Sequence, residues 1–177
     1  MRVAVGSDHA GYDLKEILKT ELATLGHDVA DLGTADAATS VDYPDYGAAV
    51  GRAVATGEAE LGVGICGSGN GIAMAANKVP GVRAAVVHDV TTAALAGQHN
   101  HANVVCFGAR TTGTTVVVDA LHAFLGAAHE PPDGNSRHLR RIEKLALLDH
   151  SADNGNGNGD AERELVHQTA PVPEGTT

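Results

Sequence analysis

Residues 61–77 of the chain read LGVGICGSGNGIAMAAN. The first six are apolar or glycine without polar alternation, which is typical of a strand covered on both faces of a parallel sheet. Three glycines at alternate positions follow, and a helix is expected over residues 72–77. A buried strand, a glycine-rich turn and a helix in direct succession make one unit of an α/β protein.

The same succession of strand and helix recurs on both sides of this unit. Further strands are expected at 2–6, 27–32, 82–87 and 103–107, and further helices at 14–25, 44–57, 90–97, 114–125 and 136–148. We therefore predict an α/β fold: a Rossmann-like five-stranded parallel sheet with helices on both faces, a three-layer sandwich. Ligands of such sheets bind beyond the carboxyl ends of the strands, so the loops there are the candidate site.

Length and composition favour one domain with a tail. Apolar residues make up 43% of the 177 residues and aromatic ones 3%, so the core must consist of small aliphatic side chains. Residues 1–149 are expected to form the domain. Residues 150–177 are polar and rich in Asn and Gly, have little to bury, and are expected to be disordered.

The net charge, the absence of targeting and membrane-spanning patterns, and the cysteines limit the possible partners and the cellular compartment. The chain has 12 Lys and Arg against 22 Asp and Glu, a net charge of −10, which opposes binding to nucleic acid or to an anionic membrane. No signal-peptide pattern and no apolar run of about 20 residues occurs. The two cysteines form no disulfide framework. We expect a cytoplasmic protein with no nucleic-acid or membrane partner.

The turn after the third expected strand, residues 61–66, has the composition of an anion-binding cradle. It consists of Gly67, Ser68, Gly69, Asn70 and Gly71. Such a turn can point its N–H groups inward, and the helix start adds positive potential. A tight turn without a ligand is the alternative. The spacing is not that of the dinucleotide-binding fingerprint.

Cys66 is the last residue of the strand and faces this cradle. The nearby N–H groups and the helix start would stabilise its thiolate, which makes a reactive role plausible. The alternative is an inert buried cysteine, and Cys106, inside an apolar run, fits that interpretation.

Other loops carry polar groups with two interpretations each. Asp8 and His9 follow the first strand and either cap a helix or bind a ligand. His99 and Asn100 lie in a polar stretch before the last strand, and the imidazole is a natural acid–base group if the stretch reaches the cradle.

Arginines near the end of the chain are candidates for binding a phosphate. Arg110 follows the last strand, and Arg137 and Arg141 are four residues apart on one helical face, where they could clamp one phosphate. The alternative is a solvated basic face. No spacing resembles a zinc site or a Ser-His-Asp triad, and no metal is expected.

Several short motifs, taken together, resemble one family over residues 1–149. They lie at 6–11, 42–44, 64–71, 75–78, 98–100 with Asn103, 107–110, and 137–138 with Arg141. Each motif is weak alone, but their joint order is specific. It resembles the ribose-5-phosphate isomerase type B family, which also includes galactose-6-phosphate isomerase subunits.

The resemblance implies a Rossmann-like fold, no metal or organic cofactor, and a homodimer or dimer of dimers whose sites are shared between subunits. It implies that Cys66 is the proton-abstracting base and that His99 assists opening of the sugar ring. The residues implied to hold the substrate are Asp8, His9, Tyr43, Gly67, Ser68, Gly69, Asn70, Gly71, Asn100, Arg110, Arg137 and Arg141.

Two positions distinguish this chain within the family. One branch lacks the cysteine and has a glutamate at the position of Ile72, whereas this chain keeps Cys66. Ser68 stands where many cysteine-type members have threonine, and the hydroxyl is retained.

The resemblance implies an aldose–ketose isomerase acting through an enediolate, with ribose 5-phosphate and ribulose 5-phosphate as the first choice of substrate pair. A tetrose phosphate (erythrulose 4-phosphate to erythrose 4-phosphate) and a hexose 6-phosphate (allose or galactose) stay open. A non-catalytic subunit and a nucleotide-binding or signalling module are further alternatives. The first is disfavoured because Cys66 and His99 are present, and a receiver-type module is disfavoured because the third expected strand ends in Cys66 and not in Asp.

Overall fold

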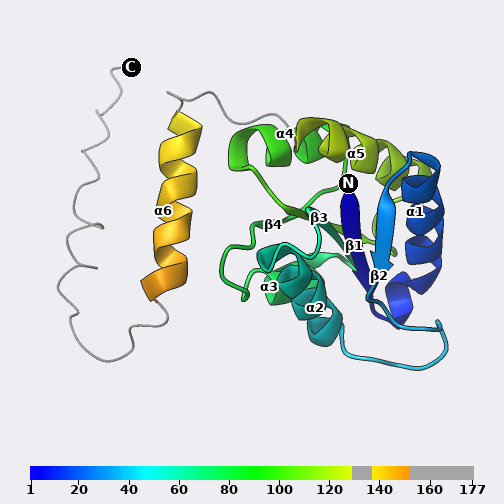
Figure 1. Cartoon of the computed structure of the whole chain (residues 1–177). Coiled ribbons are helices and arrows are strands. Elements are labelled where there is room, and N and C mark those ends of the chain that lie inside the picture. Colours follow the sequence, from blue (N-terminus) through cyan, green and yellow to red (C-terminus); the bar gives the residue numbers. More distant parts are fainter. Residues whose placement is uncertain (129–136, 152–177) are drawn as a thin grey trace, which may run out of the picture.

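Five parallel strands form one sheet in the computed structural model, which describes residues 1–128 and 137–151 (Figure 1). The strands follow the spatial order β2-β1-β3-β5-β4, and each neighbouring pair is parallel. Their bounds are β1 Arg2–Ser7, β2 Asp28–Asp31, β3 Leu61–Cys66, β4 Ala84–Val86 and β5 Val104–Gly108. The predicted Rossmann-like parallel sheet is confirmed.

Helices cover both faces of the sheet, which confirms the three-layer sandwich. The described helices are the short η1 His9–Gly11, then α1 Tyr12–Thr24, α2 Tyr43–Ala55, α3 Asn70–Ala76, α4 Val90–Asn100, α5 Thr114–Ala127 and α6 Arg137–Ser151. Strand residues alternate between two cores: Val3 and Val5 pack in a cluster with residues of α1, α4 and α5, whereas Ala4 packs in a cluster with residues of α2 and α3. This alternation follows from the period of two along a strand.

Glycines in the strands allow α2 to approach the sheet closely. A Cβ atom on Gly6 would lie 2.6 Å from Cγ2 of Val50, and one on Gly62 would lie 2.6 Å from Cγ1 of the same side chain. Val50 is fully buried, and removing it from water contributes about 1.5–3 kcal/mol. Glycines of β1 and β3 therefore make room for the helix whose first turn carries Tyr43.

Helix α4 is longer than the sequence predicts. It continues past Gly97 to Asn100. His101 then caps the helix in a left-handed conformation with a φ of 48°, and its N–H donates a hydrogen bond to the carbonyl of Gly97 at 2.9 Å. Gly97 does not stop the helix because it is a packing site: a Cβ there would lie 2.8 Å from Cβ of Ala127 on α5. His99 and Asn100 therefore belong to the last turn of a helix, and the expected loop over residues 98–100 is wrong.

Helix α6 stands beside the β4 edge of the sheet and α4, outside the three layers (Figure 1). It extends to Ser151, beyond the expected end at residue 148. The expected start at residue 136 and the tail from residue 152 lie outside the described residues, so the boundary at residue 149 and the disordered tail stay predictions. Within 1–128 and 137–151, no helix has the length and apolar character needed to cross a bilayer.

Candidate active site

The turn after β3 holds its cysteine through the backbone. Gly69 adopts a φ of 81°, a left-handed conformation that glycine adopts without strain. Its N–H donates to Sγ of Cys66 at 3.2 Å, and the N–H of Asn70 donates to Oγ of Ser68 at 3.4 Å. Two N–H groups that were expected to bind an external anion thus donate hydrogen bonds within the turn, and the acceptor of one of them is the cysteine sulfur.

The two cysteines lie on one face of the sheet in different surroundings. Cys66 ends β3 and is 4% exposed, whereas Cys106 is fully buried opposite Gly64, two residues deeper in the sheet. Burial, together with the neighbouring Cys66 sulfur, raises the pKa of the Cys106 thiol. Cys106 is therefore neutral, as the inert interpretation predicted.

A cleft of about 580 Å³ opens at the carboxyl ends of β1 and β3. It is lined by Asp8, Tyr43, Cys66, Gly67, Ser68, Gly71, Met74, Arg110 and Thr111. Seven of these are candidates from the sequence. Met74 and Thr111 were missed, although Met74 is three residues after Gly71 on the same helical face and 67% exposed, a pattern that could have identified it.

Two candidate side chains form walls of this cleft. The Tyr43 ring packs directly on Gly71, where a Cβ atom would lie 2.6 Å from ring carbons. The Arg110 side chain runs along Gly67, where a Cβ would meet its Nη1 at 3.7 Å. The exposed guanidinium therefore stands at the mouth of the cleft, where an anionic group of a ligand would find it.

Asp8 and His9 both have structural partners. Asp8 is buried and its Oδ1 accepts the Gly11 N–H at 3.0 Å, so the predicted capping role is confirmed for η1. Nδ1 of His9 accepts the Val41 N–H at 3.2 Å. Because that nitrogen must be unprotonated to accept, the neutral imidazole carries its proton on Nε2.

The remaining candidates, His99, Asn100, Arg137 and Arg141, lie away from the carboxyl ends of the strands. Helix α4 starts after the carboxyl end of β4 and runs back to the amino end of β5, a length of about 16 Å at 1.5 Å per residue. His99, in its last turn, therefore cannot reach Cys66 of the same chain. Its ring stacks on that of His138, with centroids 4.2 Å apart.

These four candidates lie on α4 and α6, near the contact between the two helices. Asn100 lines an open cleft of about 450 Å³ together with residues near β4 and on α6, among them Arg83 and Leu145. Arg137 and Arg141 are exposed on α6. Within one chain the stretch around His99 does not reach the cradle, because the helix that connects β4 to β5 runs back to the amino ends of the strands.

Two half-buried groups near this junction, Arg83 and His101, are joined by a hydrogen bond. Nε of Arg83 donates to the carbonyl of His101 at 2.9 Å. Burial lowers the pKa of Arg83, and burial together with Arg83 lowers the pKa of His101. Among the residues that the structure describes, no group of three or more His, Cys, Asp or Glu side chains could hold a metal ion.

Comparisons with known proteins agree with the family resemblance of the sequence motifs. A family profile described as Ribose/Galactose Isomerase matches residues 3–145. Ribose-5-phosphate isomerase B of Escherichia coli (strain K12) is 39% identical over 148 residues, covering 84% of this chain and 96% of that protein. Galactose-6-phosphate isomerase subunit LacB of Clostridium acetobutylicum is 41% identical over 145 residues, covering 82% and 83%.

A solved structure of Clostridium thermocellum ribose-5-phosphate isomerase B superposes with a TM-score of 0.81 at 39% identity, covering 86% of this chain and 99% of that one. Fold and sequence motifs agree over the same part of the chain. The chain therefore belongs to the ribose/galactose isomerase family and is an aldose–ketose isomerase.

Proposed function

We propose that the protein interconverts ribose 5-phosphate and ribulose 5-phosphate, with Cys66 as the base. The observation that carries the assignment of the base is the position of its sulfur, which ends β3 in the cleft and accepts the Gly69 N–H. The choice of a five-carbon sugar phosphate is supported by the relatives named ribose-5-phosphate isomerase B.

The reaction removes a proton from the carbon next to a carbonyl and returns it to the neighbouring carbon. The Cys66 thiolate takes this proton, and the Gly69 N–H supports the sulfur while it is charged. Negative charge then develops on the substrate oxygen, and donors must be in place before the reaction. Because Oγ of Ser68 accepts from Asn70, its O–H proton is available to donate to that oxygen.

The phosphate of the substrate would bind at the mouth of the cleft. Arg110 stands beside Gly67 there, and His9 offers an Nε2 proton from the neighbouring turn. Charge-assisted contacts at the phosphate hold the other end of the sugar in register with the cysteine.

We further propose a homodimer or dimer of dimers in which each cleft is completed by a second copy. His99, Asn100, Arg137 and Arg141 lie at the edge of the sheet away from their own Cys66, so a partner must supply them if they act in catalysis. Exposed leucines on α6 support this proposal, because a second copy would cover them. We also infer a reducing cytoplasm, which keeps both cysteines as thiols.

Galactose 6-phosphate is the second candidate substrate, favoured by the 41% identity with a galactose-6-phosphate isomerase subunit. An assay of the purified protein with erythrulose 4-phosphate, ribose 5-phosphate, allose 6-phosphate and galactose 6-phosphate tests the choice. We expect the highest kcat/KM with ribose 5-phosphate. A higher value with a four- or six-carbon sugar phosphate would replace this substrate assignment but not the base.

A further inference from the structure

A buried ammonium group lies at the carboxyl end of β2, where the loop to α2 begins. Lys15 on α1 is 1% exposed. Its Nζ donates to Oδ1 and Oδ2 of Asp31 at 3.0 and 2.9 Å and to the carbonyl of Thr34 at 2.8 Å. Removing a charge from water is costly unless it is paired and hydrogen-bonded, and these contacts offset that cost.

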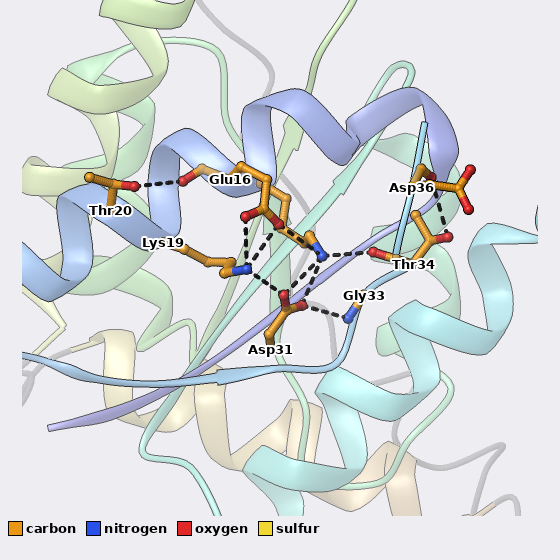
Figure 2. Close-up of polar contacts among 8 residues, drawn as sticks. Glu16, Lys19, Thr20, Asp31, Gly33, Thr34 and Asp36 are labelled. Carbon is orange, nitrogen blue, oxygen red and sulfur yellow. Dashed lines mark hydrogen bonds and ion pairs between the residues drawn. The ribbon is translucent and has the colours of Figure 1, made fainter. Parts of the chain in front are cut away.

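The partners of Lys15 belong to the end of β2 and the loop that follows. Figure 2 shows Asp31, Gly33 and Thr34 converging with Glu16 and Lys19 of α1. Oδ1 of Asp31 accepts the N–H of Gly33 at 3.0 Å, and the N–H of Thr34 donates to the carbonyl of Ser7 at 3.0 Å. The start of the β2–α2 loop is thus fastened to α1 and to the end of β1.

From Thr34 onward, the loop is held by its own side chains while it crosses the surface. Oγ1 of Thr34 donates to the carbonyl of Asp36 at 3.4 Å. Oδ1 of Asp36 accepts the N–H groups of Ala38 and Thr39 at 2.8 and 2.7 Å. Residues 35–40 are exposed, so these hydrogen bonds, and not burial, give the loop its shape.

The far end of the loop contacts His9, which follows the carboxyl end of β1. The N–H of Val41 donates to Nδ1 of His9, which selects the tautomer with a proton on Nε2. A loose loop would leave the imidazole free to rotate and to exchange tautomers, so Nε2–H would be presented only part of the time.

We propose that Lys15 is a positioning residue for His9, acting through the Thr34–Val41 loop to present the imidazole Nε2–H to the phosphate. The inference rests on the proposed function for the role of His9. The link between Lys15 and the His9 tautomer stands apart from it, because that link is a property of the protein without substrate.

Lys15→Met tests the proposal, since the thioether has a similar length and no charge. Lys19→Met is the matched control: Lys19 also pairs with Asp31, at 2.6 Å, but it is 27% exposed and has no hydrogen bond to Thr34 among the described contacts. Ring ¹⁵N NMR of His9 is expected to show one Nε2–H tautomer in the parent and in Lys19→Met, and both tautomers in Lys15→Met. A single Nε2–H tautomer in folded Lys15→Met would overturn the proposal.

Kinetics with ribose 5-phosphate give a second readout. We expect Lys15→Met to raise KM about tenfold, the effect of weakening one charge-assisted contact, with kcat within about twofold. Lys19→Met should keep both parameters. In a His9→Ala background, Lys15→Met should have no further effect on KM, and an undiminished effect there would show that Lys15 does not act through His9.

Asp36→Ala covers the case in which Lys15→Met does not fold. Asp36 is exposed, so its loss loosens the loop without disturbing the core. The same tautomer mixture and raised KM would support the proposal, and parental values would overturn it. If the parent does not isomerise ribose 5-phosphate, the proposed substrate fails, and the tautomer comparison still decides whether Lys15 positions His9.

Discussion

The imidazole of His99 stacks on that of His138, with ring centroids 4.2 Å apart and ring planes 12° from parallel. This contact joins the last turn of α4 to the first turn of α6, which also carries Arg137. His99 and the basic face of α6 therefore form one structural unit at the amino edge of the sheet. Cys66 and its cleft form another at the carboxyl edge.

If each site combines the Cys66 cleft of one copy with the His99 unit of another, two differently defective copies should complement each other. Cys66→Ala and His99→Asn variants should each be nearly inactive. When the two are co-expressed, a mixed dimer has one site carrying both substitutions and one intact site, so the statistical mixture should regain about a quarter of parental turnover. Co-purified mixed dimers that stay inactive would contradict shared sites, and Cys66→Ala with a tagged copy of itself is the control.

The two cysteines make a matched pair for testing the base. Cys66→Ala should lower kcat by about 10²–10⁴-fold, the usual contribution of a general base, with circular dichroism and the oligomeric state unchanged. Cys106→Ala should retain turnover because its neutral thiol is buried away from the cleft. Steady-state assays of both variants check this, and near-normal turnover in Cys66→Ala would remove the assigned role.

Arg137 and Arg141 should act on substrate affinity rather than stability. Each Arg→Ala change should raise KM about 10- to 100-fold through loss of one charge-assisted contact, while Tm hardly changes because both side chains are exposed. Lys substitutions should restore only part of the affinity, since an ammonium lacks the planar fork. Arg52→Ala on α2 removes one exposed positive charge as well and controls for the change in net charge. If the Arg137 and Arg141 variants have the same KM as the parent, the two arginines form only a solvated basic face.

Gly71→Ala should displace Tyr43 from the wall of the cleft, because the added methyl group would lie 2.6 Å from ring carbons. We expect weaker substrate binding although alanine favours a helix. Gly126→Ala on α5 meets nothing within 4 Å, so it should stabilise the fold by about 0.5–1 kcal/mol without an effect on activity. Urea unfolding and KM measured on both variants separate the two effects, and an unchanged KM in Gly71→Ala would mean that Tyr43 does not contact the substrate.

The Lys15–Asp31 network should make stability depend on pH in the acid range. Burial alone would raise the pKa of Asp31, but the hydrogen bonds from Lys19, from the Gly33 N–H and from Lys15 lower it. A lowered folded-state pKa contributes stability that is present above the unfolded value of about 4 and is lost as the pH falls through the folded value. The protein should therefore lose stability below about pH 4 as this carboxylate is protonated.

Asp31→Asn separates this contribution from the rest of the acid response. At pH 7 it should cost about 2–3 kcal/mol, less than for a fully buried pair because Asp31 is partly exposed. Near pH 3 the gap between parent and variant in urea unfolding should shrink, since the parent carboxylate is then protonated. A gap that stays constant with pH would mean that the charge of Asp31 contributes no stability.

The order of strands and helices and the members of the cleft could largely be predicted from the sequence. Apolar runs without alternation indicated buried parallel strands, and the turn from Cys66 to Gly71 is a local unit whose glycines dictate its backbone. Four candidates in that turn, Cys66, Gly67, Ser68 and Gly71, therefore line one cleft. Side chains within a few residues of each other need no long-range contact to become neighbours.

Only the tertiary structure decided the length of α4, the edge on which His99 lies and the burial of Lys15. Gly97 reads as a helix stop until its contact with Ala127 is known, and a lysine on an amphipathic helix reads as solvated until Asp31 and Thr34 pack over it. These outcomes depend on residues distant in the chain, so no local pattern encodes them. By itself the sequence determined the sheet and the cysteine at its carboxyl edge, whereas the crossover from β4 to β5 separated His99 from that cysteine, because parallel strands require the connecting helix to run back to the opposite edge.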